Sequence, residues 1–434
     1  MSDRLTIALR LYRLFSAATT PLVPLLLARR LKRGKESGAR LSERRGKAGL
    51  ERPDGALIWL HAASVGELAS VLPLIERINS RGINVLVTTG TVTSSDLAQQ
   101  RLPRGVIHQF VPIDIPHYVR KFLQHWQPDL ALFVESDLWP NIMIETSQRG
   151  VPMILINARL SENSYQRWRH LPRSIANLLK RLDLCLAGTP GDALRLSDLG
   201  APRVITTGNL KLDVPAPLAD PGKLAQLMDA IAGRPVIAAA STHSGEEDIV
   251  IAAHQRLRVN FPDLLTLIAP RHPERGPAIA EIAAAAGLSV RLRSRGELPD
   301  RTTAVYVADT MGELGIAYRV APVVFMGGSL VQHGGQNPIE AAKLGTAILH
   351  GPHVWNFAEI YAALDEAHGA EPVLDANRLT ACFGAWLGNP AAGAHVAAVA
   401  KTTVEALGGG LDRTLHSLDP YLMQLQLRQR AYNA

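Results

Sequence analysis

Cysteine is almost absent from this 434-residue chain, which contains only Cys185 and Cys382. The two residues lie far apart in the sequence and show no metal-ligand spacing. Their scarcity excludes a disulfide framework and indicates a reducing compartment. The fourteen histidines form no metal-like cluster, and the chain lacks an aspartate-rich pair of the kind that holds a diphosphate-bound metal. We therefore expect no metal and no other cofactor.

Long hydrophobic runs are also missing. Residues 14–28 are apolar and uncharged, but they are interrupted by Pro21 and Pro24 and are shorter than the ~20 residues that span a bilayer. No small-residue cleavage site of the secretory kind is present. A dense basic cluster follows between Arg29 and Lys47. Two interpretations stay open. We favour a membrane-associating segment at residues 1–35, and the alternative is a basic arm whose apolar patch docks on its own domain.

The chain after residue 50 also lacks an excess of basic residues. Residues 1–50 contain twelve Lys and Arg against three acids, whereas the whole chain has a net charge of +7. The remainder is therefore slightly acidic, which argues against a nucleic-acid-binding protein. The basic residues beside the apolar segment attract anionic headgroups and favour a cytoplasmic location for the rest of the chain.

Short apolar runs alternate with helical stretches from residue 56 onward, in two series. Near-continuous apolar strands between helices are typical of parallel sheets covered on both faces. The chain is therefore predicted to be α/β, with two doubly wound, Rossmann-like domains. The predicted strands are residues 57–61, 85–89, 106–111, 130–134, 153–156, 184–187 and 204–207, then 236–240, 264–269, 304–307, 323–326 and 347–349.

The domain boundaries follow from this rhythm. Residues 36–212 form the first predicted domain and 223–410 the second. A proline-rich linker at 213–222 joins them, and 411–434 form a helical tail. Ligands of open parallel sheets bind beyond the carboxyl ends of the strands. Two such edges facing each other across the hinge would make a cleft for two substrates, as in a two-Rossmann glycosyltransferase.

The glycine-rich stretch Gly327–Glu340 follows a predicted strand. Asn337 suits an N-cap, and Pro338 and Ile339 would begin the next helix. A glycine-rich turn at such a place presents free backbone N–H groups, which suit a phosphate. Glu340 in the first helical turn could accept hydrogen bonds from a ribose. The alternative is a glycine-rich turn with an ordinary capping acid.

Three charged residues are catalytic candidates in the first half. Glu67 follows a strand and a Ser-Val-Gly turn and opens a helix, where the helix dipole favours the carboxylate. It could serve as a general base, or it could be an ordinary acid of a helix first turn. Glu135 directly follows an apolar strand, so it is either paired or functional. Lys211 lies at the hinge, where it could reach a cleft or be a solvated linker lysine.

Strand ends in the second half also carry ligand-type residues. Arg271, after Pro270, suits a phosphate or the edge of a base. Thr310, Met311 and Gly312 offer backbone N–H groups at another helix start. Among the histidines, His61 and His272 are the two that we single out as candidate site residues.

With these residues in view, the sequence resembles the 3-deoxy-D-manno-octulosonic acid (Kdo) transferases of lipopolysaccharide synthesis. The resemblance covers nearly the whole chain. One departure is Glu135-Ser136-Asp137, where the family commonly has Glu-Thr-Glu, which leaves the geometry around Asp137 open. The matching motifs are His61–Glu67, Glu135–Asn141, Asn157–Ser161, Gly208–Asp213, Ser241–His243, Pro270–Arg275, Asp309–Leu314 and Gly327–Glu340.

The resemblance implies a GT-B fold, a CMP-Kdo donor and, as acceptor, an acylated glucosamine disaccharide precursor of lipid A. It also implies a location at the cytoplasmic face of the inner membrane. By motif, Glu67 would be the general base, and Glu135 and Lys211 would support the transition state. CMP would be held by Pro270, Arg271, Thr310, Met311, Gly312, Asn337, Pro338, Ile339 and Glu340.

The implied reaction inverts the configuration at the anomeric carbon and needs no metal, because CMP leaves with one phosphate that helix N-termini and Arg271 could stabilise. Two alternatives stay open. One is a sugar-nucleotide epimerase or hydrolase of the same fold. The other is a non-catalytic, membrane-peripheral lipid-binding protein, which would have no affinity for CMP.

Overall fold

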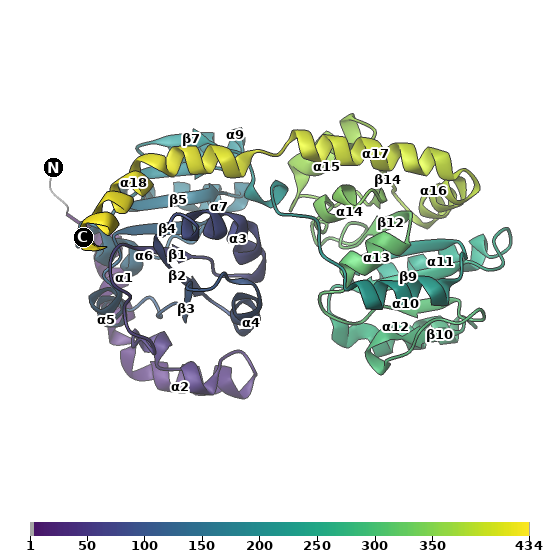
Figure 1. The fold of residues 1–434 in the computed structure, drawn as a ribbon, viewed down its shortest axis with the longest axis horizontal. Coiled ribbons are helices and arrows are strands. Elements are labelled where there is room, and N and C mark those ends of the chain that lie inside the picture. Colours follow the sequence, from purple (N-terminus) through teal and green to yellow (C-terminus); the bar gives the residue numbers. More distant parts are fainter. Residues whose placement is uncertain (1–3, 434) are drawn as a thin grey trace. The chain divides into compact units, whose positions relative to one another are not determined.

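The computed structural model describes residues 4–433, which divide into two compact units (Figure 1). The first unit runs to Val214 and includes the stretch from Gly408 onward, and the second spans Pro215–Leu407. Residues 1–3 and 434 of the predicted terminal segments lie outside the described residues. Each unit is built on one seven-stranded parallel sheet, which confirms the predicted α/β class with two Rossmann-like domains.

The sheet of the first unit has the order β3-β2-β1-β4-β5-β6-β7. Its strands are β1 (Leu57–His61), β2 (Asn84–Thr89), β3 (Ile107–Phe110), β4 (Leu130–Val134), β5 (Met153–Ala158), β6 (Leu184–Ala187) and β7 (Val204–Thr206). Its helices are α1 (Ile7–Ala18), α2 (Val23–Lys32), α3 (Val65–Asn79), α4 (Val92–Arg101), α5 (Pro116–Trp126), α6 (Pro140–Ser147), α7 (Glu162–Arg169), α8 (Pro172–Leu179), α9 (Pro190–Asp198) and α18 (Gly410–Asn433).

Helices cover both faces of this sheet, as alternate residues of β1 show. Ile58 and Leu60 pack with α3 and with leucines of α18, whereas Leu57 and Trp59 pack with α5, α6 and α8. Successive side chains of a strand point to opposite faces, so a strand buried on both sides must be apolar throughout. The predicted C-terminal helix is therefore part of the first unit's core, which the sequence did not indicate.

The sheet of the second unit has the order β10-β11-β9-β8-β12-β13-β14. Its strands are β8 (Val236–Thr242), β9 (Leu265–Pro270), β10 (Val290–Leu292), β11 (Val305–Val307), β12 (Val323–Met326), β13 (Ala347–His350) and β14 (Ala370–Pro372). Its helices are α10 (Pro221–Ile231), α11 (Glu246–Leu257), α12 (Gly276–Ala285), α13 (Leu314–Val320), α14 (Ile339–Lys343), α15 (Ala358–Glu366), α16 (Ala376–Gly388) and α17 (Pro390–Ala406).

The two strands that the sequence did not predict, β10 and β14, are the edge strands of this second sheet. Each has three residues, and β14 contains Pro372. Edge strands are half exposed and can be short, so they lack the continuous apolar run that marks the central strands. Each of the twelve strands that the sequence predicted is present.

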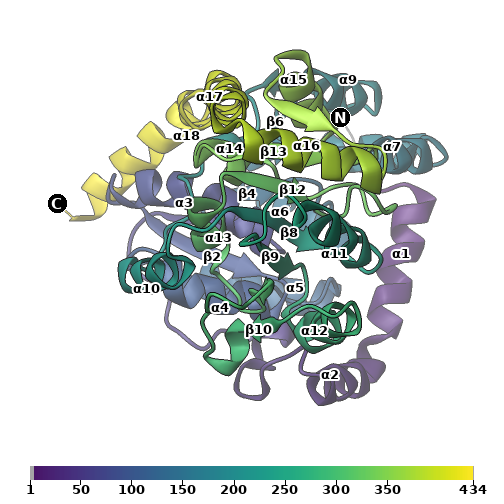
Figure 2. The ribbon, with the colours of Figure 1, turned by 90° about the vertical axis from the view of Figure 1, so that its right-hand side faces the viewer.

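The N-terminal segment folds as α1 and α2, which meet at an angle (Figure 2). One side docks on the first unit through buried Leu9, Val23 and Leu27, and Tyr12 Oη donates a 2.9 Å hydrogen bond to Asp114. The other side is apolar and exposed. Its large side chains are those of Ile7, Leu11, Leu14, Phe15, Leu22, Leu25, Leu26 and Leu31.

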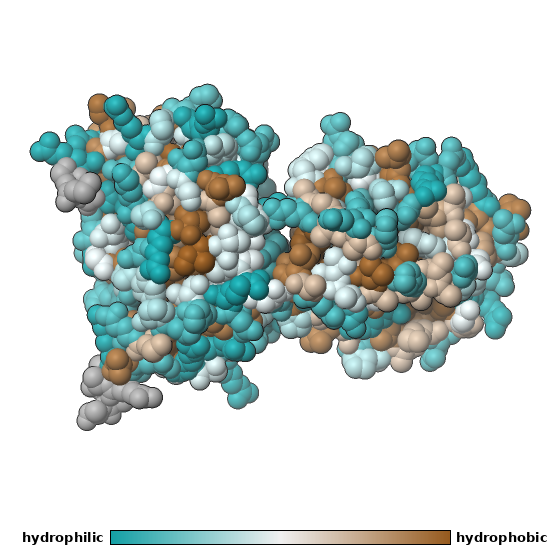
Figure 3. Space-filling model, turned by 90° about the horizontal axis from the view of Figure 1, so that it is seen from above, coloured by the Kyte–Doolittle hydropathy of each residue, from teal (hydrophilic) through white to brown (hydrophobic). Residues whose placement is uncertain are grey.

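Among the described residues, no single helix is long and apolar enough to cross a membrane. The helical segments Ile7–Ala18 and Thr20–Lys32 are long and apolar enough only when they are taken together, and this pair is bent by 42°. Docking on its own domain is thus part of the structure, and association of the exposed side with a membrane stays a prediction. Other exposed apolar residues are scattered, and Figure 3 shows them on the viewed face as separate patches among hydrophilic residues.

Candidate functional site

The first unit gathers the catalytic candidates where its strand order reverses. The chain passes from β1 outward to β3 and then returns to place β4 on the other side of β1. In open α/β sheets the carboxyl ends at such a switch point form a ligand-binding crevice. Glu67 lies in the helix that follows β1, and Glu135 directly follows β4.

Glu67 is held by the start of α3. The helix begins at Val65, two residues earlier than predicted, and Ser64 is its N-cap. The Glu67 carboxylate accepts hydrogen bonds from Ser64 Oγ and from the Ala63 backbone N–H, both at 2.8 Å. Glu67 is therefore a capping acid. Its carboxylate can still accept a further hydrogen bond or a proton, because each carboxylate oxygen can accept more than one hydrogen bond.

The pKa of Glu67 is raised above its ordinary value. Burial is the largest cause, and the negative charges of Asp137 and Glu135 act in the same direction. The hydrogen bonds from Ser64 and Ala63 oppose the shift and lower the pKa. A carboxylate with a raised pKa is a stronger base, which suits removal of a proton from an alcohol.

Glu135 and Lys211 form an ion pair. Lys211 Nζ lies 2.6 Å from Glu135 Oε1, and the side chains are 20% and 17% exposed. The solvated-lysine alternative for Lys211 is therefore wrong. Glu135 adopts a left-handed backbone conformation with φ of 59°, which is uncommon for a residue with a side chain and occurs often at functional sites.

Asn157, near the end of β5, also has a positive φ angle, of 48°. Its Oδ1 accepts a 3.0 Å hydrogen bond from the Leu210 N–H, and Asn209 Oδ1 accepts one from the Lys211 N–H. Asn157 thereby fixes the short 3-10 helix Leu210–Leu212 that carries Lys211. Sequence reasoning gave Asn157 no role, although it opens one of the matching motifs.

His61 lies at the end of β1 and is fully buried. Its Nδ1 is 2.9 Å from Thr88 Oγ1, and its Nε2 is 3.4 Å from Asp137 Oδ2. Asp137, where the sequence departs from the family pattern, thus faces both His61 and the site of Glu67. The first unit therefore places Glu67, Glu135, Asp137 and Lys211 at one edge of its sheet.

The second unit collects the predicted nucleotide residues at the carboxyl ends of its central strands. Pro270 ends β9 and is followed by the exposed Arg271, whose N–H donates to the carbonyl of Thr242, the last residue of β8. Thr310, Met311 and Gly312 follow β11, and Met311 is 73% exposed. The stretch Gly327–Glu340 follows β12. Because the strands are parallel and adjacent, all of these segments lie at one edge of the sheet.

The glycine-rich turn differs from its prediction, because several backbone N–H groups of this turn are not free. Those of Gly328, Ser329 and Leu330 donate to the carboxylate of Glu246, and those of Gly335 and Gln336 donate to backbone carbonyls of Gly328 and Gly327. The prediction of free N–H groups is therefore wrong at these five residues.

The following helix begins one residue later than predicted. It is the five-residue α14, with Pro338 at the N-cap position in place of Asn337. Asn337 Oδ1 nevertheless accepts a 3.1 Å hydrogen bond from the Ile339 N–H. Glu340 is largely buried, and this burial raises the pKa of its carboxyl group.

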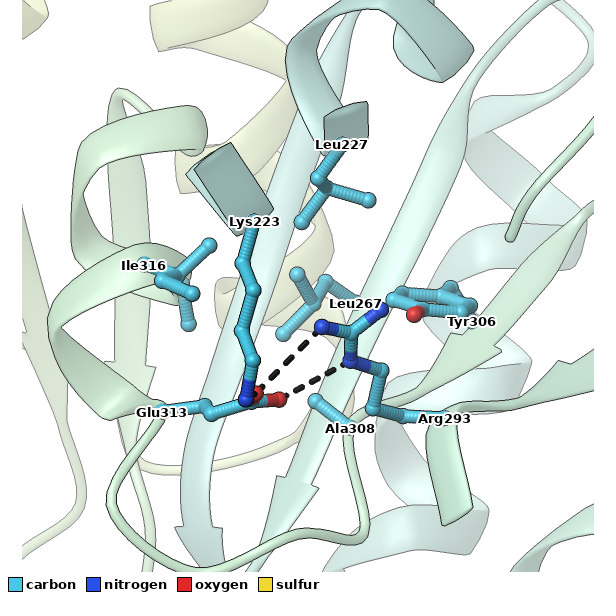
Figure 4. Close-up of a pocket in the computed structure, with 9 residues that line it drawn as sticks. Lys223, Leu227, Leu267, Arg293, Tyr306, Ala308, Glu313 and Ile316 are labelled. Atoms are coloured by element: carbon cyan, nitrogen blue, oxygen red, sulfur yellow. Dashed lines mark hydrogen bonds and ion pairs between the residues drawn. The ribbon is translucent and has the colours of Figure 1, made fainter. Parts of the chain in front are cut away.

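Two cations fix the loop that carries Thr310. Glu313 accepts hydrogen bonds from Lys223 Nζ at 2.7 Å and Arg293 Nε at 2.9 Å, as Figure 4 shows, and from Thr310 Oγ1 at 2.6 Å. Burial raises the pKa of Glu313, but these bonds outweigh it and lower the pKa to about 2. The adjacent cavity, lined also by Tyr306, holds about 10 Å³, enough for a water molecule but not for a nucleotide.

Three histidines meet beside the glycine-rich turn. The His243 ring stacks on His333 with centroids 4.0 Å apart, and His272 meets it edge-on at 6.1 Å. Burial, followed by the charges of His333, His272 and Arg271, lowers the pKa of His243 to about 4. His243 is therefore neutral at pH 7. Sequence reasoning singled out His272 alone, because stacking between residues far apart in the chain leaves no local signal.

No group of three or more His, Cys, Asp or Glu side chains within residues 4–433 is arranged to hold a metal ion. Metal independence stays a prediction.

Gln336 Nε2 lies 3.1 Å from His243 Nε2, so one imidazole nitrogen of the group formed by His243, His272 and His333 already has a protein partner.

The fold is similar to that of several solved structures. A UDP-GlcNAc 2-epimerase from Neisseria meningitidis, solved with UDP-GlcNAc, superposes with a TM-score of 0.59 at 14% identity, covering 84% of this chain and 100% of that one. A glycosyltransferase from Rickettsia africae superposes with a TM-score of 0.58 at 11% identity, covering 86% and 99%. These similarities establish the GT-B type of fold, and at such identities they do not establish the activity.

Sequence comparison places the family. Residues 39–214 match the family model described as 3-Deoxy-D-manno-octulosonic-acid transferase (kdotransferase). The 3-deoxy-D-manno-octulosonic acid transferase of Bordetella pertussis is 35% identical over 95% of this chain and 99% of its own length. That of Haemophilus influenzae is 33% identical over 88% and 91%. The chain therefore belongs to the 3-deoxy-D-manno-octulosonic acid transferase family, and it is a glycosyltransferase.

Proposed function

We propose that this glycosyltransferase moves Kdo from CMP-Kdo to a sugar hydroxyl of an acylated glucosamine disaccharide, the precursor of lipid A, and releases CMP with inversion at the anomeric carbon. The observation that carries the proposal is the group formed by Glu67, Glu135, Asp137 and the Lys211 ammonium at the switch point of the first sheet. It combines a base of raised pKa with a fixed cation.

The proposed step begins with ionised Glu67. Its carboxylate takes the proton of the acceptor hydroxyl while the hydroxyl oxygen attacks the anomeric carbon of Kdo. The bond between that carbon and the phosphate oxygen breaks, and the electron pair leaves with CMP. Attack and departure on opposite faces invert the configuration. The half-buried ion pair of Lys211 and Glu135 holds an ammonium group in place, which would stabilise negative charge developing in the transition state.

The second unit would hold the donor. Arg271 is an exposed cation that follows β9, Glu340 is a largely buried carboxyl group of raised pKa, and Met311 offers an exposed apolar side chain. Together with Pro270, Thr310, Gly312 and Asn337–Ile339, they supply groups suited to a phosphate, a ribose and a base. Since the N–H groups of Gly328, Ser329 and Leu330 are occupied, we assign the phosphate to Arg271.

The exposed apolar side of α1 and α2 supports membrane association. It lies beside the basic residues Arg29, Arg30 and Lys32 at the end of α2. An amphipathic helix with adjacent basic residues binds the headgroup region of an anionic membrane. We propose that the enzyme acts at the cytoplasmic side of the inner membrane, where a lipid acceptor would be presented.

Mass spectrometry of the lipid after incubation of the full chain with CMP-Kdo and the acylated disaccharide tests the proposal. The expected result is a product that carries added Kdo, with matching release of CMP, and NMR of the new linkage should show inversion relative to the donor. Release of free Kdo without a lipid product would indicate a hydrolase. An isomerised donor would indicate an epimerase, and the absence of CMP binding in calorimetry would favour a non-catalytic lipid-binding protein.

A further inference from the structure

Glu246, the first residue of α11, is a fully buried carboxylate whose hydrogen bonds reach two loops. Oε2 accepts from the N–H groups of His243 and Gly328, at 2.9 and 2.7 Å. Oε1 accepts from those of Ser329 and Leu330, both at 3.0 Å. Four backbone donors therefore converge on one side chain. An ionised carboxylate is acceptor-only and has room for four hydrogen bonds, so its capacity is fully used.

This arrangement places a protein anion where a glycine-rich turn otherwise binds a phosphate. Consecutive backbone N–H groups in such a turn form a concave site for an anion. The helix dipole at the start of the 12-residue α11 stabilises the same negative charge. Because Glu246 belongs to the chain, the anion that the turn at Gly328–Leu330 binds is present without any ligand.

The packing of the turn leaves little room for another conformation. A Cβ atom on Gly327 would lie 2.4 Å from the Ser241 carbonyl oxygen, and one on Gly351 would lie 2.2 Å from that of Ser329. Gly328 adopts a left-handed conformation with φ of 67°. The turn is therefore pressed against the end of β8 on one side and the start of the loop after β13 on the other.

The neighbouring Glu247 connects the same helix to the loop after β9. It is fully buried and accepts two hydrogen bonds from the guanidinium of Arg275, at 2.5 and 3.1 Å. Such bidentate pairs fix the orientation of both partners. Arg275 ends the short loop that begins with Arg271. Two adjacent acids at the start of α11 thus hold the two segments that contain Arg271 and Asn337–Glu340.

We propose that Glu246 and Glu247 are positioning residues that arrange both nucleotide-binding segments before CMP-Kdo arrives. Neither residue needs to touch the substrate. Their effect is to spare the enzyme the entropic cost of ordering these loops at the moment of binding. This inference rests on the proposed function, because it assigns the two segments to a cytidine nucleotide.

The test compares the full-length wild type with Glu246→Gln, Glu247→Gln and Asp248→Asn. Asp248 is exposed in the same first turn of α11 and loses the same charge, so it is the matched control. In Glu246→Gln the new Nε2 group faces backbone donors that it cannot satisfy. Calorimetry with CMP, steady-state kinetics with CMP-Kdo, and hydrogen exchange of the apo-protein measured by mass spectrometry are the readouts.

We expect at least tenfold weaker CMP binding in Glu246→Gln, a raised KM for CMP-Kdo with a smaller change in kcat, and faster exchange confined to peptides of residues 326–336. Glu247→Gln should show the same pattern at residues 270–276, and Asp248→Asn should match the wild type. CMP affinity within twofold of the wild type in both Gln variants would overturn the proposal, as would faster exchange throughout the unit.

Failure of the proposed function and failure of this inference give different results. If the wild type itself does not bind CMP, both fall together. If the wild type binds CMP and loosening of the turn leaves binding unchanged, only the inference fails. Should Glu246→Gln not fold, Glu247→Gln, whose partner is a side chain, decides the outcome.

Discussion

Replacement of Glu67 separates its structural role from its catalytic one. In Glu67→Gln the amide oxygen can still accept from the Ala63 N–H, and the amide nitrogen can donate to Ser64 Oγ, so both 2.8 Å contacts have a substitute. The weakened hydrogen bonds cost about 1 kcal/mol. Because the folded state raises the pKa of Glu67, the ionised group also costs stability at neutral pH, and the substitution removes that cost. We expect a nearly unchanged melting temperature.

Activity should behave differently from stability in this variant. A positioned general base contributes a factor of roughly 10² to 10⁴, so transfer should fall by that amount while CMP binding to the second unit is kept. The mass-spectrometric transfer assay and calorimetry with CMP measure the two quantities. Retained transfer in Glu67→Gln would refute the assignment of Glu67 as the base.

The pH dependence gives a second test with a defined sign. A base is active when ionised, so kcat/KM should fall tenfold per pH unit below its pKa, and this acid limb should lie above the ordinary glutamate value of 4.5. Asp137→Asn removes a charge that raises the pKa, so the limb should move to lower pH. Ser64→Ala removes a hydrogen bond that lowers the pKa, so the limb should move to higher pH. Shifts in the same direction would contradict the electrostatic account.

Three further predictions concern other contacts. Lys211→Met should lower transfer at least tenfold, because it removes the ammonium paired with Glu135, and circular dichroism should be unchanged. Asp213→Ala removes the acceptor of the Gly409 and Leu411 N–H groups and should lower the free energy of unfolding by about 2 kcal/mol in urea. Changing the exposed Leu14 and Phe15 to Ser should weaken sedimentation with anionic liposomes without lowering the melting temperature. The reason is that burial of each of these side chains in a membrane contributes about 2 kcal/mol to the free energy of binding.

Matched controls exist for each of these changes. Lys180→Met removes an exposed lysine from the first unit and should leave transfer unchanged. Asp229→Ala removes an exposed acid from α10 and should leave stability unchanged. Leu194→Ser alters a leucine that is 73% exposed in α9 and should leave liposome binding unchanged. Equal effects in a variant and its control would contradict the corresponding prediction.

Much of the candidate site could be placed from sequence because it lies at strand ends. Glu67, Glu135, Arg271 and Thr310 all follow apolar runs, and parallel strands bring their carboxyl ends to one edge. The sequence could not provide the partner of each polar group. Lys211 was open to a solvated role until the structure paired it with Glu135.

The glycine-rich turn is a second place where the sequence did not provide the partner of a polar group. Its glycines correctly indicated a tight turn, whereas the close approach of Gly327 to the backbone of Ser241 was not predicted. The anion that its N–H groups bind is the side chain of Glu246, more than eighty residues earlier in the chain. A local pattern specifies that donors are available, but it does not specify which acceptor reaches them.

The sequence by itself determined the alternation of strands and helices, the two-domain α/β class and the edges at which ligand groups occur. Each of these depends on apolar periodicity, which is a property of neighbouring residues. Tertiary structure decided that α18 completes the first unit, that Lys211 is paired, and that Glu246 closes the glycine-rich turn. These outcomes depend on which distant groups meet in a buried environment, where an unpaired polar group is costly and the fold must supply its partner.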